Sequence, residues 1–329
     1  MKQRQIGKNG PWVDEVGFGA MSIAGAFGPA DPDVSRKALD LVFAQDHPHI
    51  DTALIYGPFT SETLIGEHLK KHPTVRKKLH LATKGGINAN PRAINNSAAF
   101  MRECLEGSLK RLGVDHIDLY YVHRRDHTIS IEDLMGTMAG FVKEGKILGI
   151  GLSEIAPSTL ERASKVHHVA AVQNEYSLWS RQPELGIIQA CKRLGTALVA
   201  FSPVGRGALT DKSVDPARMG NSEWRKTMPR FQAENWPHNA VYIEKFRAYA
   251  NAKGWTAEAL ANAWVLAQGQ HIIPIPGTRT AQHHAQNLKA SEIVLTPEDL
   301  AEIESILPAG FAHGNRYSAE QQGSAEQYC

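Results

Sequence analysis

Short apolar runs alternate along this chain with longer stretches of helical periodicity, and this alternation constrains the fold more than any other feature. The apolar runs cover residues 16–21, 49–51, 79–84, 117–123, 147–153, 169–175, 197–202 and 271–276. Strands separated by helix-length stretches indicate a parallel sheet, because a parallel neighbour needs a crossover connection. Eight such units without a compositional break favour a closed (β/α)8 TIM barrel over an open sheet.

Turn signals refine this α/β prediction. Asn9-Gly10, between two short extended runs, predicts an N-terminal β-hairpin before the barrel. Residues 205–238 lack periodicity and are expected to form a long loop at the C-terminal rim of the barrel. The polar tail from about residue 312 to 329 is expected to lie over the barrel mouth. We therefore predict one domain covering residues 1–329.

The composition is that of an ordinary globular protein. Of 329 residues, 42% are hydrophobic and 21% are charged, and a net charge of +2 gives no reason to expect a nucleic-acid or membrane partner. Cys104, Cys191 and Cys329 fit neither an even disulfide framework nor paired metal-ligand spacing. The first residues do not resemble a signal peptide, and no apolar run approaches about 18 residues. These features predict a cytoplasmic protein and favour no particular oligomeric state.

An open sheet that binds a dinucleotide is the rival architecture. Its fingerprint requires a third glycine or an alanine in the loop after the first strand. The stretch Gly17-Phe18-Gly19-Ala20-Met21-Ser22 has serine at that place. Asp51 does end the second apolar run, so the residues alone leave this alternative open.

Four polar side chains stand at the ends of apolar runs or just after them. Asp51, Lys84 and His123 end three of the runs, and Tyr56 follows Asp51 by five residues. The carboxyl ends of parallel strands meet at one rim of a barrel, so these groups are expected to converge there. Taken singly, each has an ordinary structural explanation, as a helix cap, a packing residue, a core histidine or a solvated lysine. Their coincidence at one rim favours catalysis.

Together these groups are suited to protonating a carbonyl oxygen. A lysine cation beside a phenol favours the phenolate form, which makes Tyr56 a useful general acid near neutral pH. Asp51 would hold the ammonium group of Lys84 in place, and His123 would orient the substrate oxygen. These residues thus predict proton transfer to a carbonyl compound.

The chain resembles the aldo-keto reductases over nearly its whole length. The matching motifs are Asp51-Thr52-Ala53 with Tyr56-Gly57, residues 81–84, 108–120, His123-Arg124, and residues 149–153, 173–177, 201–207 and 275–279. The resemblance, which is to NADPH-dependent bacterial enzymes of the monomeric-barrel type, implies that Asp51, Tyr56, Lys84 and His123 are a catalytic tetrad. It implies reduction of aldehydes or ketones to alcohols by hydride transfer from NADPH, with Tyr56 as the proton donor.

The resemblance also implies a site for NADPH along the C-terminal rim. Ser153 and Gln173 are expected to hold the carboxamide, and Phe201 to stack on the nicotinamide ring. Glu154 stands where relatives often have asparagine, which puts one carboxamide contact in doubt. Arg279 is expected to bind the 2′-phosphate and so to favour NADPH over NADH, a solvated helix-start residue being the alternative. The residues expected to bind NADPH are Ser153, Gln173, Phe201, Ser202, Pro203, Gly205, Arg206, Gly207, Leu209, Gly277, Thr278, Arg279, His283, Gln286 and Asn287.

The carbonyl substrate is expected to meet a mostly apolar and aromatic wall. The residues expected in it are Met21, Phe27, Tyr56, His123, Tyr176 and Trp179, with Glu175 and the segments around Trp224 and Tyr317. Such a wall suits small aromatic or aliphatic carbonyls but discriminates poorly by size. No metal is expected, because the adjacent His283 and His284 would point apart on a helix.

Two other classes of function match parts of this pattern. A cofactor-sensing regulatory subunit of the same family would keep the tetrad but turn over slowly, and it would be expected to carry an added N-terminal segment. A barrel lyase or metal hydrolase would need carboxylate and histidine ligands at several strand ends, and only Asp51 and His123 qualify. We expect an enzyme rather than a sensor.

Overall fold

The eight apolar runs form eight parallel strands of one sheet that closes on itself. The computed structural model describes residues 1–212, 214–220 and 223–327. In barrel order the strands are β3 (Phe18–Gly19), β4 (His49–Asp51), β5 (His80–Gly85), β8 (Ile117–Val122), β9 (Ile147–Ser153), β10 (Ala171–Glu175), β11 (Ala197–Phe201) and β12 (Ile272–Ile275). A parallel bridge between Gly19 and Gly277 joins the first strand to the last. The predicted (β/α)8 barrel is therefore confirmed.

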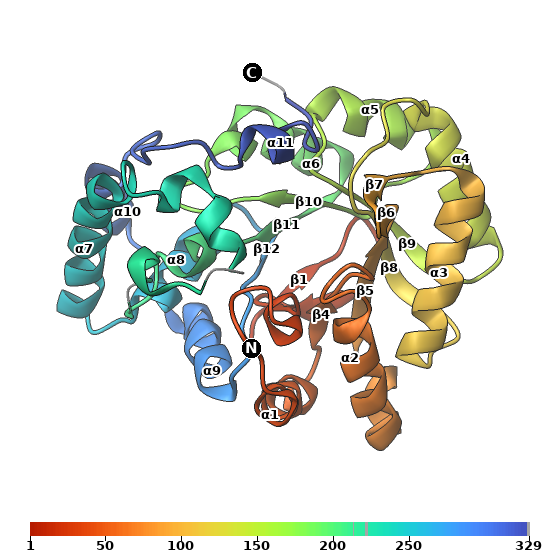
Figure 1. Cartoon of the computed structure of the whole chain (residues 1–329), viewed down its shortest axis with the longest axis horizontal. Coiled ribbons are helices and arrows are strands. Elements are labelled where there is room, and N and C mark those ends of the chain that lie inside the picture. The colour runs from red at the N-terminus through yellow and green to blue at the C-terminus, as the bar shows by residue number, and fades with distance from the viewer. Residues whose placement is uncertain (213, 221–222, 328–329) are drawn as a thin grey trace.

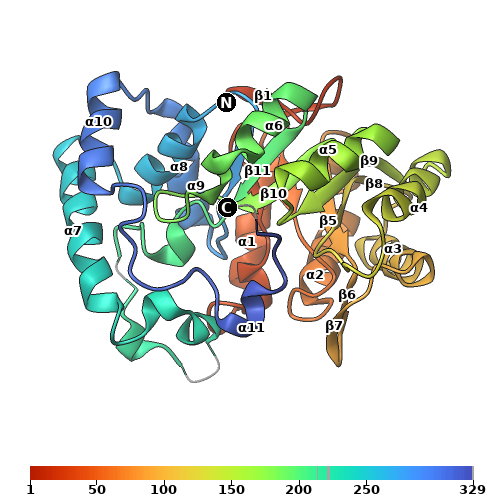
Figure 2. The same ribbon diagram turned by 90° about the horizontal axis from the view of Figure 1, so that it is seen from above.

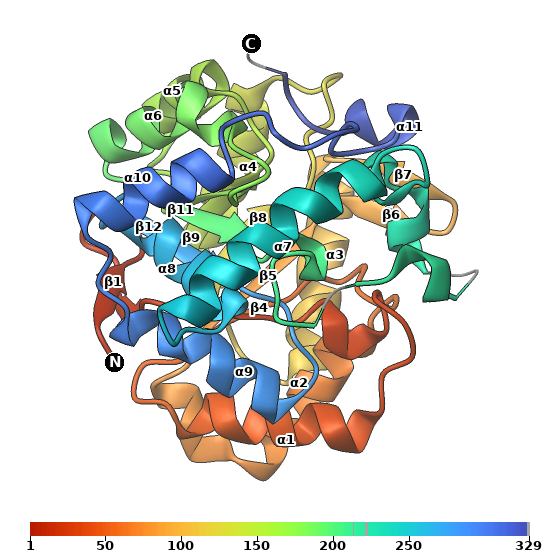
Figure 3. The ribbon, with the colours of Figure 1, turned by 90° about the vertical axis from the view of Figure 1, so that its left-hand side faces the viewer.

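Helices follow the strands and surround them on the outside (Figure 1). They are α1 (Pro32–Ala44), α2 (Thr60–Lys71), α3 (Ala98–Leu112), α4 (Ile131–Lys143), α5 (Pro157–Val166), α6 (Ile187–Leu194), α7 (Trp236–Ala252), α8 (Ala257–Ala267), α9 (Ala281–Leu288), α10 (Pro297–Ile306) and α11 (Ala319–Gln322). Helices α7 and α10 contact each other outside the barrel layer (Figure 3). None of the helices in the described ranges is both long enough and apolar enough to cross a membrane.

Local sequence signals explain several helix ends. The carboxylate of Asp31 accepts hydrogen bonds from the backbone amides of Asp33 and Val34 and so caps α1. Thr296 and Asp299 form a reciprocal capping box at the start of α10. Gly113 closes α3 with a φ of 66°, a left-handed conformation that glycine adopts without steric cost. Each of these caps satisfies backbone groups that the helix itself leaves unpaired.

Some details differ from the prediction. The helical stretch between β10 and β11 is split, because a 3-10 helix, Gln182–Leu185, precedes α6 and Gly186 between them has a φ of 134°. Helix α7 begins at Trp236, inside the segment 205–238 that was expected to be a loop, since a proline in the first turn of a helix removes no required hydrogen bond. Both differences arise from backbone chemistry at a single residue.

The long rim loops contain structure that periodicity could not reveal. Strands β6 (Ile87–Ala89) and β7 (Arg92–Ile94) form an antiparallel hairpin in which Ile87 is buried and the other residues are half-buried or exposed. The segment 205–238 contains the 3-10 helices Gly205–Gly207, Pro216–Arg218, Trp224–Thr227 and Pro229–Phe231. Residues 213, 221 and 222 of this segment lie outside the described residues.

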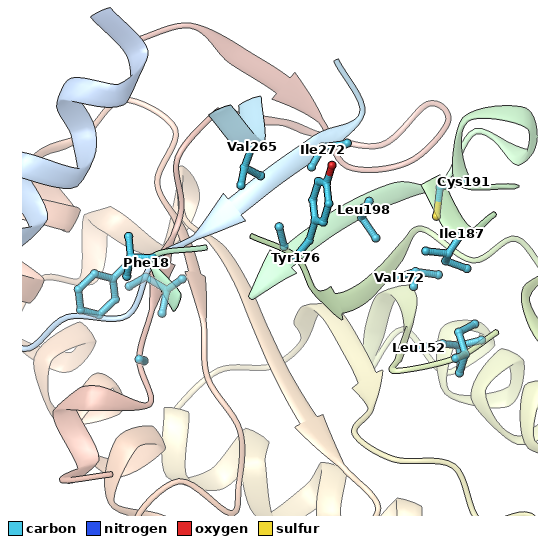
Figure 4. Packing of buried hydrophobic residues seen from close by; sticks show 14 of the residues in the cluster. Phe18, Leu152, Val172, Tyr176, Ile187, Cys191, Leu198, Val265 and Ile272 are labelled. Atoms are coloured by element: carbon cyan, nitrogen blue, oxygen red, sulfur yellow. The ribbon is translucent and has the colours of Figure 1, made fainter. Parts of the chain in front are cut away.

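The apolar core has two layers. The larger one lies between strands and helices, and Figure 4 shows part of it, including Phe18, Val172 and Leu198. Burying a side chain of this size contributes about 1.5–3 kcal/mol relative to leaving it exposed. The smaller layer lies inside the barrel and contains Tyr121 and Val199 together with residues of the N-terminal hairpin. Because this inner layer is packed, the barrel is a solid support for the rim and not a pore.

The N-terminal hairpin closes one end of the barrel. Strands β1 (Gln3–Gln5) and β2 (Trp12–Asp14) pair antiparallel, as the Asn9-Gly10 signal predicts. Ile6 and Val13 are 2% and 1% exposed and pack into the inner layer. The guanidinium of Arg4 donates to the carbonyl of Ile272 at 2.7 Å and to that of Leu266 at 2.9 Å. With this end closed, the opposite rim is the one available for chemistry.

The chain after α10 runs across the barrel towards α11 (Figure 2). The amide side chain of Asn239 in α7 donates to the His313 carbonyl at 3.0 Å and accepts from the His313 backbone amide at 2.8 Å. Further on, Glu326 N donates to the carbonyl of Glu154 at 2.9 Å, and Arg125 pairs with the Glu326 carboxylate at 2.6 Å. These contacts fix the described part of the polar tail against the strand ends; residues 328 and 329 lie outside the described residues.

Candidate active site

Lys84 is the centre of the cluster at the C-terminal rim. Its ammonium group donates to a carboxylate oxygen of Asp51, to the Thr52 carbonyl at 2.8 Å and to the Tyr56 hydroxyl at 3.2 Å. The side chains of Lys84 and Asp51 are 1% and 2% exposed. The three donor positions of the ammonium group are thus directed at a carboxylate, a carbonyl and a phenol.

The parallel sheet explains why these groups meet. Asp51 ends β4, Lys84 is near the end of β5, and His123 follows the last residue of β8, so all three stand at the same rim. Tyr56 reaches the rim through a turn in which its amide donates to the carbonyl of Ala53 at 3.1 Å. The predicted convergence of Asp51, Tyr56, Lys84 and His123 in space is therefore present in the structure.

The charges of the cluster are set by burial and pairing. Burial alone would lower the pKa of Lys84, but Asp51 and the Tyr56 hydroxyl outweigh it and leave the pKa above its usual value. Asp51 also accepts a hydrogen bond from the amide of Gln173 at 2.7 Å. Lys84 is consequently a cation at neutral pH, held beside the phenol by a counter-ion that is fixed from two sides.

His123 is arranged to act as an uncharged imidazole. Burial, followed by the nearby cations Arg124, Lys84 and Arg92, holds its pKa well below the usual value. Its ring stands edge-on to the ring of Tyr56, with centroids 5.9 Å apart. A neutral imidazole at this place can donate a hydrogen bond to the oxygen that Tyr56 protonates.

A cavity of about 440 Å³ opens beside the cluster and extends from Tyr56 to α9. The predicted residues that line it are Met21, Phe27, Asp51, Tyr56, Gln173, Phe201, Ser202, Arg206, Gly207, Gly277, Thr278, Arg279, His283, Gln286 and Asn287. Lys84, His123, Ser153, Pro203, Gly205 and Leu209 are not among the lining residues. Fifteen of the predicted positions thus share one cavity, although they come from distant parts of the sequence.

The carboxamide end of the expected cofactor site is formed by β9, β10 and β11. The Ser153 hydroxyl donates to the Gln173 carbonyl at 2.9 Å and accepts from Arg124 at 3.2 Å. Because the Gln173 amide nitrogen is used by Asp51, its side-chain oxygen is the atom left for a carboxamide N–H donor. Phe201 is partly exposed at the end of β11 and offers a ring face to the cavity.

At the other end of the cavity, Arg279 is the main cation. Its Nη1 donates to the carbonyls of Phe27 and Gly28 at 3.2 and 3.0 Å. The remaining guanidinium donors can serve a phosphate. Gly205, Gly207 and Leu209 were also expected at the cofactor site, and their backbone amides donate to carbonyls of the same turn. These three amides are therefore already used within the loop.

Tyr176, Trp179 and Glu175 do not reach the cavity wall in which they were expected. Tyr176 is fully buried, and its hydroxyl donates to Glu184 at 2.8 Å. Trp179 is 4% exposed and its ring packs edge-on against Phe231. These side chains fall on the core side of the rim, a distinction that aromatic character alone does not reveal.

Glu175 instead belongs to a buried network of charged side chains. Arg206 pairs with Glu175 at 2.5 Å, and its guanidinium lies 5.0 and 4.9 Å from the ring centres of Trp224 and Tyr317. Arg316 in the tail pairs with the carboxylate of Glu154 at 2.5 Å. Glu154, the residue that departs from the expected asparagine, is therefore a partner for the tail.

Several lining residues were not found from the sequence. They are Gly19, Ala20, Ser22, Val204, Thr210, Asp211, Lys212, Val214, Arg225, Glu258, Ile275 and Gln282. Arg225 lies 5.1 Å from the ring centre of Phe27 and donates to the Arg206 carbonyl at 2.9 Å, so it connects two sides of the cavity. Most of the missed residues lie in loops, where no periodic pattern identifies the inward face. The arginines of the 205–238 segment were the one sequence feature that could have indicated a contribution of this segment to the cavity.

Comparisons with known proteins agree with this geometry. The sequence model of the Aldo/keto reductase family matches residues 15–308. The probable aldo-keto reductase 1 of Glycine max is 39% identical over 317 residues, covering 95% of this chain and 91% of that protein. The structure of the glycerol dehydrogenase AKR11B4 from Gluconobacter oxydans superposes with a TM-score of 0.82 at 26% identity, covering 93% of this chain and 94% of the other. A thermostable aldo-keto reductase, Tm1743, in complex with the inhibitor epalrestat, gives a TM-score of 0.70 at 25% identity over 93% of this chain and 100% of the other.

Proposed function

The chain belongs to the aldo/keto reductase family, and on that premise we propose that it reduces aldehydes or ketones to alcohols with NADPH. Membership makes it an oxidoreductase of a family that typically uses a nicotinamide cofactor and acts on small molecules. The observation that carries the finer proposal is the triple contact of Lys84 with Asp51, Thr52 and the Tyr56 hydroxyl beside the cavity. In the alcohol direction the same site would act as an NADP⁺-dependent alcohol dehydrogenase.

Tyr56 is the proton donor in this proposal. NADPH, when bound, supplies the hydride to the carbonyl carbon. The Tyr56 hydroxyl gives its proton to the carbonyl oxygen, and the Lys84 cation stabilises the phenolate that remains. Asp51 keeps Lys84 oriented, and the neutral His123 donates a hydrogen bond to the same oxygen. All of these groups sit at a rim where water is largely excluded, which strengthens each electrostatic interaction.

Residues at the two ends of the cavity support NADPH as the cofactor. Phe201 offers a ring for stacking, and the Gln173 side-chain oxygen accepts from the carboxamide. Arg279 supplies a planar set of donors for the 2′-phosphate, a group that NADH lacks. A cytoplasmic location, predicted from the cysteines, would give the enzyme access to this cofactor.

Tyr56→Phe tests the assigned proton donor. The variant should lose about 10²-fold or more in kcat for an aldehyde, because it removes the general acid and no cofactor contact. NADPH binding, followed by the change in cofactor fluorescence, should be nearly intact. Tyr121→Phe is the matched control, since the Tyr121 ring also lies near Lys84 but Tyr121 is not among the residues that line the cavity. Equal activity of Tyr56→Phe and wild type would contradict the mechanism.

Arg279→Ala tests the cofactor preference. Loss of charge-assisted hydrogen bonds to a phosphate costs about 1.5–3 kcal/mol, or about ten- to a hundredfold in NADPH affinity. NADH serves as the internal control because it has no 2′-phosphate. Equal weakening of both cofactors would show that Arg279 does not bind this group.

A panel of carbonyl compounds distinguishes the enzyme from the alternative, a cofactor-sensing subunit with slow turnover. The mixed lining of Met21, Phe27 and Phe201 with polar residues suits small aromatic and aliphatic aldehydes. Because one structural relative is a glycerol dehydrogenase, glyceraldehyde and dihydroxyacetone belong in the panel. Steady NADPH oxidation with any of them supports the enzyme, whereas tight NADPH binding without turnover on the whole panel favours the sensor.

A further inference from the structure

Three side chains with metal-ligand chemistry meet between α1 and α2. Asp40 lies in α1, His68 lies in the last turn of α2, and His72 directly follows that helix. The two helices contact each other and lie together in Figure 1. Barrel helices run back from the C-terminal rim, so the last turns of α1 and α2 lie towards the opposite end of the barrel from Tyr56. The cluster is thus separate from the cavity described above.

The ligand atoms are close enough to share one ion. The Asp40 carboxylate lies 2.9 Å from His68 Nε2 and 3.9 Å from His72 Nε2, and all three ligand atoms lie within 4.8 Å of one another. Zinc bonds of about 2.0–2.2 Å place tetrahedral ligands roughly 3.3–3.5 Å apart, and the two observed distances bracket this value. His68 and the residue after the end of α2, His72, have ring centroids 4.7 Å apart, so both imidazoles reach the same place.

His68 places a buried imidazole at this cluster. Its side chain is 5% exposed, its Nε2 faces the Asp40 carboxylate at 2.9 Å, and its Nδ1 has no hydrogen-bond partner among the described residues. The ring packs against Phe43 and against the ring of His72, with centroids 4.9 and 4.7 Å apart. A buried imidazole that is held by two rings, with its Nε2 directed at a carboxylate, is already oriented as a metal ligand would be.

We propose that Asp40, His68 and His72 form a binding site for one divalent transition-metal ion, with zinc as the best fit. Two imidazoles and one carboxylate suit zinc, nickel or copper, whereas calcium and magnesium prefer oxygen ligands. The Asp40 and His72 side chains are 56% and 45% exposed, so an ion can reach the site from solvent and water can complete its coordination. The ion would cross-link α1 to α2, which the Arg36–Glu67 pair already joins at 3.4 Å.

The test is calorimetric titration of the full chain with zinc chloride. The protein carries no affinity tag and is first stripped of metal with a chelator. It also has the substitution Cys329→Ser, because the thiol of Cys329, which lies outside the described residues, would compete for zinc. We expect one equivalent to bind. Asp40→Asn and His72→Asn should each weaken this binding about tenfold or more, since each removes one of three protein ligands. Both residues are exposed, so neither change should disturb the core.

His116→Asn is the matched control. His116 lies 3.8 Å from the Asp118 carboxylate but has no third ligand near it within the described ranges, so its loss should leave zinc affinity unchanged. Cobalt(II) gives a second readout, because its absorption bands should be present in wild type and His116→Asn but lost in His72→Asn. Failure to bind one equivalent, or binding that survives both Asp40→Asn and His72→Asn at wild-type affinity, overturns the proposal.

Discussion

Replacing Lys84 by methionine should destabilise the fold and not only stop catalysis. Lys84→Met removes the ammonium group from a pair whose side chains are 1% and 2% exposed, and so leaves the Asp51 carboxylate buried without a counter-ion. Breaking a buried pair in this way typically costs about 3–5 kcal/mol. The hydrogen bond from Gln173 to Asp51 at 2.7 Å remains and offsets part of this cost. We therefore expect the free energy of unfolding of Lys84→Met to fall by about 3 kcal/mol, the lower end of that range.

A double substitution distinguishes the effect of the buried charge pair on stability from its effect on catalysis. In Asp51→Asn/Lys84→Met both charges are gone, and the free energy of unfolding should return to within about 1 kcal/mol of wild type, because a buried pair exchanged for neutral groups is often close to neutral overall. Carbonyl reduction should stay about 10²-fold or more below wild type in both variants, since the phenol has lost its cation.

The measurement is urea unfolding without cofactor at pH 7, followed by tryptophan fluorescence, for wild type, both single variants and the double variant. The four free energies of unfolding give the coupling between the two side chains. A coupling below about 0.5 kcal/mol, or a double variant as unstable as Lys84→Met, would refute the claim that pairing holds these charges in the core.

Two further predictions concern packing and pH. Gly66→Ala in α2 should destabilise by about 1–3 kcal/mol in urea unfolding, because its Cβ would stand 2.1 Å from the Arg111 carbonyl. The exposed Gly136 of α4 has nothing within 4 Å of an added Cβ, so Gly136→Ala should stabilise by about 0.5–1 kcal/mol. Equal effects of the two substitutions on the free energy of unfolding would contradict the packing. Burial lowers the pKa of His284 to about 4 from the usual 6.5, so the unfolded chain takes up a proton that the folded chain does not, and stability should fall as pH drops from 6.5 to 4. Over that pH range the free energy of unfolding of His284→Leu should fall by about 3 kcal/mol less than that of wild type. If the two proteins lose stability in parallel as the pH falls, His284 is not the group that causes the loss.

The sequence revealed the parts of the fold that depend on repeated patterns. Eight apolar runs predicted the barrel, because each buried strand needs several consecutive apolar residues and each helix needs its own period. The caps at Asp31 and Gly113 were equally readable, since each rests on the chemistry of one residue. The break at Gly186 was not, because a glycine inside a helical pattern is often tolerated.

The site was readable to the extent that strand ends identify it. Asp51, Lys84 and His123 follow apolar runs, so their convergence follows from the parallel sheet itself. Tyr176 and Trp179 were misplaced because an aromatic residue just after a strand can face either the cavity or the core, and only packing decides. Arg225 comes to the cavity through a loop whose path depends on contacts with Phe27 and Arg206, which lie far away in the sequence.

The anchoring of Arg4 has a consequence for how this protein is made. Its partners Leu266 and Ile272 are more than 260 positions further along the chain, and the bridge from Gly19 to Gly277 spans a similar length. A chain emerging from the ribosome therefore carries its first segment without a docking place until the last barrel unit has been translated. Closing so long a loop is slow, so the nascent protein should depend on chaperones until synthesis is nearly complete.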